Sequence, residues 1–409
     1  MIAFTEQVQV RKVEGKGNCL YVVCPSGFGD LVFAENPLFF ASCQSELFSN
    51  MQRVCSEIQN LEYDCHWYHA ALVALMSKDH LRIDTCLRKW FPSDNRLKEA
   101  SVILDKILPY IRDERDQENT PVLSPQLLRD AVLIWRYNSF AHYSHEHSLV
   151  MYNMTSFMSH SCKPSAAWAF GEGDTFNLRS VRDLKADDEL TISYISEDQL
   201  TMPTFMRRRF LSNWLFTCAC ERCALASDRN RTFKCTNCSI GELVVSSSAC
   251  STTPGDIPQC TACCYCTSPE AFLNLLDLEQ QYFDRVGSID PTNLRDIMDV
   301  YDGALNMFTV NHWLVYKLET LLLPLLGKDG DPLTLSLQQN RIRYLESLGF
   351  PTYTLGWAYE EVGDMLLSKN SKLASSHYER AYWTLRTITG PESGYSIAIQ
   401  SKWANLNNI

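Results

Sequence analysis

The chain has 409 residues, more than one hydrophobic core usually serves, so two or three packed units are expected. Hydrophobic residues make up 45% of the sequence and charged residues 21%, which is enough to bury a sizeable core. The formal net charge of -11 argues against a constitutive nucleic-acid binder, because phosphate backbones select basic protein surfaces. An acidic surface would instead suit basic peptides.

The predicted elements change character along the chain. Residues 1–42 predict short strands between glycine turns. Residues 45–147 predict helices, because apolar residues recur there at helical spacing. Strand character returns over 150–195, residues 217–266 read as cysteine-rich loops, and the chain from SPEAFLNLL onward predicts helix to its end.

These segments predict an α+β fold. A β-rich domain is interrupted by a helical insertion and is followed by a cysteine-rich, zinc-binding region and an all-helical C-terminal domain. The expected boundaries are 1–44 and 148–216 for the two parts of the β-rich domain, 45–147 for the insertion, 217–267 for the cysteine-rich region and 268–409 for the helical domain.

One part of the helical C-terminal segment has repeat character. Gly363 is followed by Ala374, Tyr378 and Ala381, small and aromatic residues spaced as in the second half of a tetratricopeptide hairpin. One degenerate match leaves two alternatives open, a tetratricopeptide-like domain and an unrelated helical bundle.

The cysteines cluster, and the cluster indicates metal binding. The N-terminal segment lacks an apolar core long enough for a signal peptide, and the most apolar run elsewhere, LETLLLPLL, is shorter than a membrane span, so an intracellular protein is expected. The 17 cysteines are then not a disulfide framework. Those between Cys162 and Cys266 are dense enough to be ligands, whereas the earlier ones are expected to be buried or surface thiols: Cys19, Cys24, Cys43, Cys55, Cys65 and Cys86.

Counting ligands predicts a first zinc site. Cys218, Cys220 and Cys223 form a C-x-C-x2-C motif, whose three thiolates a tight loop can turn toward one point. Structural zinc almost always takes four ligands, so one must come from elsewhere in the chain. Cys162, in the stretch SHSCKPSAAW, is the candidate.

Two further C-x2-C pairs predict a second zinc site. Cys235 and Cys238 form one pair, and Cys260 and Cys263 form the other. This arrangement is typical of zinc ribbons. Three nearby cysteines could replace a member of the second pair: Cys250, Cys264 and Cys266. The alternative to a metal site is a set of spare reduced cysteines.

The stretch SHSCKPSAAW has two other interpretations. Cys162 and His160 could be a nucleophile and its base, although residues two apart on a strand have no assured hydrogen-bond geometry and no third orienting group is apparent. His160 could also be a core histidine whose ring is satisfied by the protein.

The order of the neighbouring motifs resembles the SET-domain lysine methyltransferases, and within them the SET-and-MYND subfamily. The matching segments are GKGNCLYV, RYNSFAHYS, MSHSCKPS, DDELTISYIS and FLSNWLFTCACERC, which correspond to the family's glycine turn, Asn-Ser-Phe segment, Asn-His-Ser-Cys-x-Pro-Asn motif, Gly-Glu-Glu-Leu-Thr-Ile-x-Tyr motif and post-SET cysteines. The resemblance covers residues 8–223, and the helical tail matches the subfamily's C-terminal domain in kind.

Three departures accompany this resemblance. The MYND zinc module is missing. In this respect the chain resembles the apical complex lysine methyltransferases of protozoan parasites, which also lack it. Ser159 and Ser165 replace the two asparagines of the third motif, which puts donor affinity in question. Asp188 stands in place of the usual first glutamate, a mild substitution.

The resemblance implies an enzyme that transfers a methyl group from S-adenosylmethionine to a lysine amine of a protein. It implies that Tyr194 is the catalytic tyrosine and that Phe140 and Trp214 line the lysine channel, although core packing would be the ordinary role of the last two. The donor contacts that it implies are Lys16, Gly17, Asn138, Ser159, His160, Tyr194 and Phe216.

An alternative function belongs to another class. The two serine substitutions could mark a SET domain that has lost its chemistry and serves as a zinc-stabilised scaffold, with the helical tail as its binding surface. In either case we expect a protein partner, no direct nucleic-acid binding and no membrane span. The tail could mediate homodimerisation, and a cytoplasmic or cytoskeletal location is favoured over a nuclear one.

Overall fold

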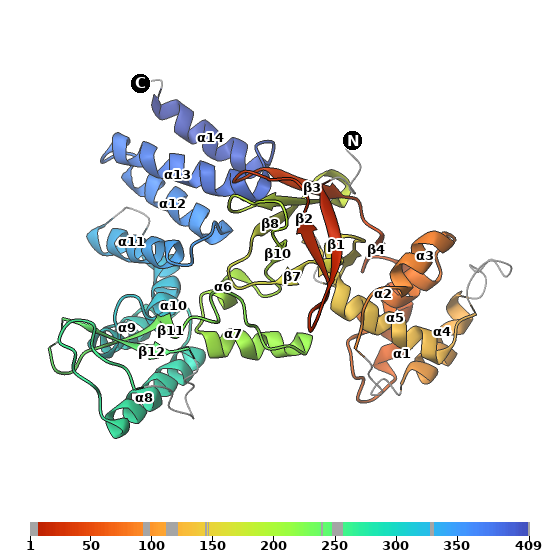
Figure 1. Ribbon diagram of the computed structural model, residues 1–409, viewed down its shortest axis with the longest axis horizontal. Helices are drawn as coiled ribbons and strands as arrows, with labels where there is room; N and C mark the ends of the chain where they lie inside the picture. Colours follow the sequence, from red (N-terminus) through yellow and green to blue (C-terminus); the bar gives the residue numbers. More distant parts are fainter. Residues whose placement is uncertain are drawn as a thin grey trace.

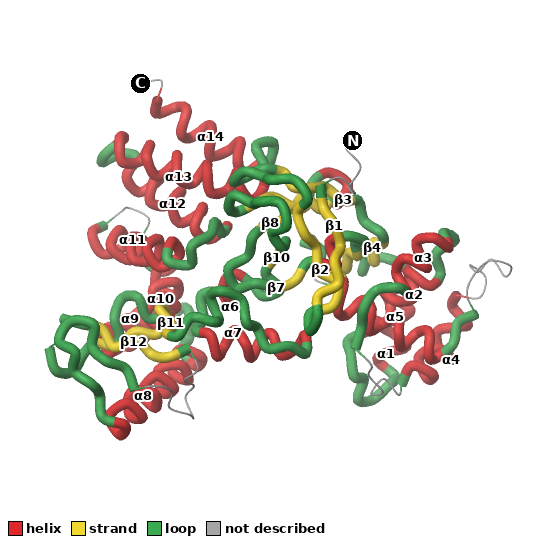
Figure 2. Tube along the Cα trace, in the orientation of Figure 1, coloured by secondary structure: helices red, strands yellow, loops and turns green. Residues whose placement is uncertain are grey.

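The computed structural model describes residues 7–92, 99–111, 122–143, 145, 147–238, 240–247, 257–327 and 331–407. Strands occupy the centre of the molecule, with one group of helices (α1–α5) on one side and a longer series (α8–α14) on the other (Figure 1). Figure 2 shows that the strands are confined to this centre and to one small hairpin beside α8 and α9. None of the described helices is long and apolar enough to cross a membrane.

The central strands form several small sheets. The hairpin β1 (Val8–Val13) and β2 (Gly17–Val22) is antiparallel. Strand β9 (Phe176–Ser180) pairs with β3 (Leu31–Glu35) and β8 (Ala166–Phe170), and β6 (Leu149–Met151) pairs with β4 (Phe39–Ala41) and β5 (Ser139–Ala141). The short strands β7 (Ser159–His160) and β10 (Thr191–Ile192) are parallel. Short 3₁₀ turns lie at Thr155–Phe157, Glu172–Asp174, Ser212–Trp214 and Leu323–Leu325.

The helical insertion has a core of its own. Its helices are α1 (Glu46–Ser56), α2 (Cys65–Leu75), α3 (His80–Leu87), α4 (Ala100–Ile111) and α5 (Pro125–Asn138). Helix α5 begins where Ser124 accepts a hydrogen bond from the Leu127 amide, with Pro125 at the first position, and it buries the face that includes Ala131 and Trp135. The expectation of helix up to residue 147 is wrong at its end, because residues 139–141 pair with β6 as strand β5.

The cysteine-rich region is more regular than predicted. After α6 (Glu197–Leu200) and α7 (Thr204–Leu211), an antiparallel hairpin forms from β11 (Ser227–Lys234) and β12 (Glu242–Ser246), where loops were expected. Phe233 of β11 is fully buried against Phe308 of the helical tail, which explains why this stretch becomes a strand.

The tail is helical throughout its described part. Its helices are α8 (Pro269–Ser288), α9 (Leu294–Met307), α10 (Trp313–Leu322), α11 (Pro332–Glu346), α12 (Tyr353–Leu366), α13 (Ser371–Thr389) and α14 (Gly394–Asn407). Helices α12 and α13 pack closely because glycines face large side chains: a Cβ at Gly363 would lie 2.6 Å from the Tyr378 ring, and one at Gly356 would lie 2.6 Å from Leu385. The small-and-aromatic spacing noted in the sequence is therefore a helix-packing pattern.

The tail returns to the central strands. Helix α13 packs against β8 and β9, and the Glu197 carboxylate accepts hydrogen bonds from the Tyr353 and Thr354 amides at the start of α12. One core of buried hydrophobic residues runs from Cys162 through the β11–β12 hairpin into the tail. The cysteine-rich region and the tail are thus held by shared packing.

Candidate functional site

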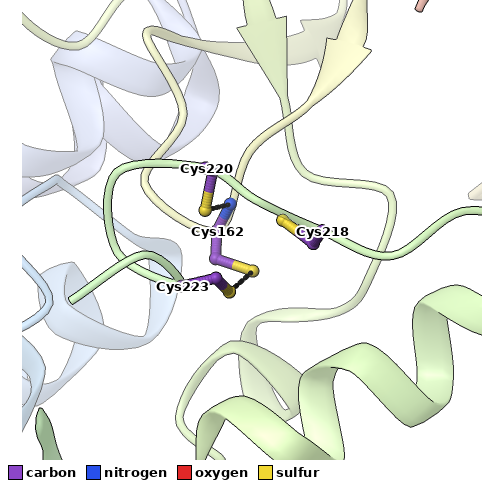
Figure 3. Close-up of side chains that lie close together, drawn as sticks. All are labelled: Cys162, Cys218, Cys220 and Cys223. Carbon is purple, nitrogen blue, oxygen red and sulfur yellow. Dashed lines mark hydrogen bonds between the residues drawn. The ribbon is translucent and has the colours of Figure 1, made fainter. Parts of the chain in front are cut away.

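Four cysteines from two distant segments converge beside β7. The sulfurs of Cys162, Cys218, Cys220 and Cys223 lie within 4.8 Å of one another, and all but Cys220 are buried (Figure 3). The sulfurs of Cys162 and Cys223 are 3.5 Å apart. The neighbouring sulfurs and burial raise the pKa of Cys162, so four thiolates require a cation. A closed set of four sulfur ligands fits structural zinc, as the sequence predicts.

Arginines surround this first cysteine group. Arg207 is fully buried and donates to the Cys223 sulfur at 3.4 Å. Burial alone would lower its pKa, but the Asp228 carboxylate and the nearby sulfurs raise it, so the guanidinium stays charged. Arg208 donates to the carbonyls of Cys218 and Cys223 at 3.1 Å each. A zinc ion with four thiolates carries net negative charge, which a buried cation offsets. Sequence reasoning missed these arginines, because nothing in the spacing of residues 207 and 208 distinguishes a buried arginine from an exposed one.

His160 connects the cysteine group to Tyr194. Its Nε2 lies 3.2 Å from the Cys162 sulfur, and its Nδ1 accepts a hydrogen bond from the Tyr194 amide at 3.0 Å. Both ring nitrogens are therefore engaged within the protein. The predicted donor contact at His160 stays a prediction; because both ring nitrogens have protein partners, such a contact would come from the His160 backbone.

Tyr194 lies among aromatic side chains. The rings of Trp214 and Phe216 are 5.7 and 6.4 Å from that of Tyr194, and His160 is 5.4 Å away. Leu215, between the two aromatic residues, has φ +62° in the left-handed region, which turns the chain so that Trp214 and Phe216 both reach Tyr194. The Tyr194 hydroxyl donates a hydrogen bond to the Met158 carbonyl. Burial raises the pKa of Tyr194, so the phenol stays protonated at neutral pH.

The glycine turn leads into β2, where Cys19 and Leu20 are buried. Gly17 has φ +84° and no side-chain neighbour within 4 Å of where a Cβ would stand, so its backbone is open to a ligand. The hydroxyl of Ser159 in β7 donates to the sulfur of Cys19 in β2 at 3.3 Å. Lys16 forms an ion pair with Glu189, the nitrogen and oxygen being 2.8 Å apart. The open backbone at Gly17 and the neighbouring ion pair of Lys16 and Glu189 leave this turn accessible to a polar ligand.

Two other predicted site residues, Asn138 and Phe140, have protein partners of their own. The Asn138 amide nitrogen donates to the carbonyls of Trp90 and Ile134 at 2.8 Å each, so its donors hold α5 to the segment after α3. The Phe140 ring contacts Tyr152, Trp168 and Phe176 at 5.2 to 5.9 Å. Phe140 thus packs in the β-rich core, and its predicted role in the channel stays a prediction.

A second cysteine group lies at the β11–β12 hairpin. Cys235, Cys238, Cys260 and Cys263 have all four sulfurs within 4.8 Å, and two of the sulfur pairs are 3.8 and 3.7 Å apart. Ligands at about 2.3 Å from a tetrahedral zinc would be about 3.8 Å from one another, so the spacing fits. Cys264 and Cys266 lie outside the group as exposed thiols, and Cys250 lies outside the described residues.

An open cavity of about 600 Å³ adjoins the site on the insertion side. Its lining includes Tyr63, His66, Trp67 and Arg136. The Arg136 guanidinium lies 5.3 Å from the Trp67 ring and 6.0 Å from the Trp214 ring, so one cation connects the insertion to the aromatic group around Tyr194. No pattern in the sequence indicates this connection.

Comparison with known proteins places this geometry in a class. Residues 34–195 match the family described as SET domain, so the chain carries a SET domain. It is similar to mouse histone-lysine N-methyltransferase SMYD3, with 24% identity over 275 residues, which is 53% of this chain and 62% of the relative. It is also similar to the potential protein lysine methyltransferase SET6 of Saccharomyces cerevisiae, with 39% identity over 69 residues, 17% of this chain and 18% of the relative.

The chain thus matches less than two thirds of these relatives' own lengths. Among solved structures, the SET domain of LSMT bound to lysine and AdoHcy aligns over 100% of this chain and 90% of that one, at 13% identity and a TM-score of 0.33.

Proposed function

We propose that this protein is an S-adenosylmethionine-dependent protein-lysine N-methyltransferase. The observation that carries the proposal is the position of Tyr194. Its hydroxyl donates to the Met158 carbonyl, its ring lies among aromatic rings, and its backbone is tied through His160 to a four-cysteine group. The SET domain match over residues 34–195 and the similarity to SMYD3 support the same conclusion.

The donor supplies a sulfonium methyl group, and this chain's residues align the acceptor with it. The backbone at Gly17, Ser159 and His160 and the Phe216 ring are the groups that would hold the donor. Because the Tyr194 proton is engaged by the Met158 carbonyl, the phenol oxygen is left to accept a hydrogen bond from the lysine amine. The raised pKa of Tyr194 makes it a hydrogen-bonding partner and not a base.

The aromatic surroundings also prepare the acceptor. A protonated lysine amine has no lone pair for attack, and a site that excludes water lowers the amine's pKa because charged groups lose solvation there. The faces of Trp214 and Tyr194 still stabilise positive charge as the methylated ammonium forms. Alignment of two reactants in one such site is itself a large part of catalysis.

Zinc in the first cysteine group would hold the post-SET loop in place. Cys162 belongs to the segment of β7, whereas Cys218, Cys220 and Cys223 follow Phe216 directly. A metal joining them fixes the Phe216 ring beside Tyr194. The second group would hold the β11–β12 hairpin against the tail. Both metals are structural in this proposal and take no part in methyl transfer.

The decisive experiment follows tritiated methyl from S-adenosylmethionine into the proteins of a cell extract. We expect labelled bands with wild type and a loss of about 100-fold or more with Tyr194→Phe, the scale set by removing one aligned catalytic hydrogen-bonding group. Tyr344→Phe is the matched control, because it removes another buried hydroxyl that donates to a backbone carbonyl, that of Thr201. Equal labelling by Tyr194→Phe would contradict the proposed role.

The alternative function, a zinc-stabilised scaffold without chemistry, makes a different prediction. A scaffold would label nothing and would not bind S-adenosylmethionine in a calorimeter, although both metals were present. The protein substrate, the cytoplasmic or cytoskeletal location and homodimerisation through the tail are parts of the proposal that the labelled bands, cell imaging and light scattering would test.

A further inference from the structure

Three aromatic side chains meet at the surface of the helical tail. Tyr353 and Trp357 lie one turn apart in α12, and Tyr395 stands in the first turn of α14. The ring centre of Tyr353 is 5.7 Å from that of Trp357 and 6.3 Å from that of Tyr395, and the rings of Trp357 and Tyr395 are 6.4 Å apart. Each ring therefore neighbours the other two, and we call this group the aromatic triad.

The aromatic triad is open to solvent. Trp357 is 40% exposed and Tyr395 is 54% exposed. Aromatic rings that serve only to pack lose most of this contact with water, because each can bury a large apolar area. The three ring planes are inclined to one another by 38 to 70°. Rings inclined in this way can turn more than one π face toward a single guest.

The triad differs from the other exposed aromatic ring of the tail. In the described part of α8–α14, the exposed aromatic side chains are Trp357, Trp383 and Tyr395. The Arg386 guanidinium lies 4.9 Å from the Trp383 ring centre, so a cation of the chain already covers that ring. No described arginine or lysine lies over a ring of the triad. The triad is thus an exposed aromatic group whose cation the described chain does not supply.

A carboxylate makes the surroundings of the triad negative. Glu197 of α6 accepts hydrogen bonds from the amides of Tyr353 at 2.7 Å and Thr354 at 2.9 Å, which fixes its charge at the start of α12. Burial raises the pKa of Tyr353, and the negative charge of Glu197 raises it further. The faces of aromatic rings are themselves the negative parts of their quadrupoles. The rings and the carboxylate therefore attract the same kind of guest, a cation.

We propose that the aromatic triad binds the methylated ammonium group of a lysine side chain in a protein. An unmethylated ammonium has three N–H donors, which rings satisfy less well than water does. Methylation replaces these donors by apolar groups and keeps the charge, so the group can leave water and pack on several π faces, as quaternary ammonium groups do in aromatic cages.

This inference rests on the proposed function, because a methylated lysine is the product of that reaction. Glu197 follows Tyr194 by three residues, which keeps their Cα atoms within about 11 Å of each other. A protein held at the triad by a lysine that already carries methyl groups would therefore lie close to the proposed catalytic site.

The test measures peptide binding to the full chain by ligand-observed NMR and uses no methyl donor. The probe is a short peptide of glycine, alanine and serine with one trimethyllysine at its centre. The same peptide with unmodified lysine, and a neutral analogue in which carbon replaces the charged nitrogen, are the comparison ligands. We expect wild type to bind the trimethyllysine peptide at least tenfold more tightly than either of them.

Variants assign this binding to the triad. Trp357→Ala and Tyr395→Ala, both at exposed positions, should each weaken binding of the trimethyllysine peptide at least tenfold. Trp383→Ala is the matched control, because it removes an exposed tryptophan of the same tail whose ring Arg386 already covers. Its affinity should equal that of wild type, and urea denaturation of each variant verifies that it is folded.

Three results would overturn the inference. Equal binding of the neutral analogue would make the triad a general apolar surface, and equal binding of unmodified lysine would remove the preference for methylated ammonium. Binding that Trp357→Ala and Tyr395→Ala leave intact would place the peptide elsewhere, such as beside Trp214. Absence of methyl transfer in the labelling experiment would instead contradict the proposed function and leave the peptide affinities unchanged.

Discussion

The His160 ring contacts both the Cys162 sulfur and the Tyr194 amide. Since Nδ1 accepts the Tyr194 amide proton, the ring proton is assigned to Nε2, which then donates to the Cys162 sulfur. A metal-binding thiolate is a good acceptor for that proton, and such outer hydrogen bonds orient ligands in metal sites. One imidazole thus connects the first cysteine group to the backbone of Tyr194.

Replacing Cys162 tests this connection. We expect Cys162→Ser to lower the zinc content, measured by mass spectrometry of the metal, by about one atom per chain and to abolish methyl transfer. Cys43→Ser, which changes a cysteine outside both groups, should keep the wild-type content. Full zinc and full activity in Cys162→Ser would show that Cys162 is not a ligand.

The two cysteine groups differ in their exposure to solvent. The first is enclosed by arginines, and Cys162 has no exposed surface. In the second, Cys263 is exposed, and the exposed thiols Cys264 and Cys266 follow it in the chain. Solvent and competing ligands therefore reach the second group more easily.

A chelator should accordingly remove the two metals at different rates. We expect EDTA to withdraw one zinc per chain at least tenfold faster than the other, followed with a colorimetric zinc indicator. Cys263→Ser should eliminate the fast phase and leave the slow one. Release of both metals in a single phase would contradict the difference in protection.

The α12–α13 hairpin depends on its glycines. Gly363→Ala places a Cβ 2.6 Å from the rigid Tyr378 ring, and we expect it to lower the free energy of unfolding by about 1–3 kcal/mol despite alanine's better helix propensity. The control, Gly287→Ala in α8, meets no atom within 4 Å and should raise stability by about 0.5–1 kcal/mol. Urea denaturation of both variants measures the difference, and equal effects would exclude close packing as the cause.

Across the whole molecule, one buried ion pair connects the β11–β12 hairpin to the tail. Arg231 donates to the Glu279 carboxylate, which also accepts from the Trp313 ring at 2.8 Å, and all three residues are buried. Although burial would raise the pKa of Glu279, Arg231 and His312 hold it at about 2. This carboxylate therefore stabilises the folded state above its ordinary pKa, and that stability is lost as the pH falls from about 4.5 to about 2.

The pKa of a second buried glutamate in the tail, Glu319, is shifted in the opposite direction. Glu319 accepts from Tyr301 at 3.0 Å and from Asn340 at 2.8 Å on one oxygen, while its other oxygen has no partner among the described residues. Burial raises its pKa from 4.5 to about 7. Its favourable contribution is complete below about 4.5 and is lost as the pH rises through about 7.

The variants Glu319→Gln and Glu279→Gln should therefore change the free energy of unfolding in opposite directions at pH 8. At pH 8, Glu319→Gln should be more stable than wild type by up to about 3 kcal/mol, a gain absent at pH 4.5, whereas Glu279→Gln should be less stable by about 3–5 kcal/mol because it leaves Arg231 buried and unpaired. Urea denaturation at both pH values measures each difference. A pH-independent effect of Glu319→Gln would show that the carboxyl does not titrate in this range.

Sequence reasoning predicted the parts of the site that follow from spacing. The completion of C-x-C-x2-C by Cys162 came from counting ligands, and the order of motifs predicted the neighbourhood of Tyr194, Trp214 and Phe216. It left open whether the His160 ring is satisfied by the protein. It could not predict what three-dimensional packing decides, such as the hydrogen bonds from Asn138 to the Trp90 carbonyl and from Arg207 to the Cys223 sulfur. The β11 strand was also missed, because its pairing depends on contact with the tail and not on local pattern.

Strands β4 and β5 both pair antiparallel with β6, so the chain that joins them makes a parallel crossover. A crossover of this kind needs about a dozen residues, and the segment 42–138 far exceeds that length. The sheet constrains only the two ends of the segment. A gene can therefore lengthen, shorten or exchange what lies between them while the pairing of the strands is kept, which allows the surface next to the site to evolve separately from the chemistry.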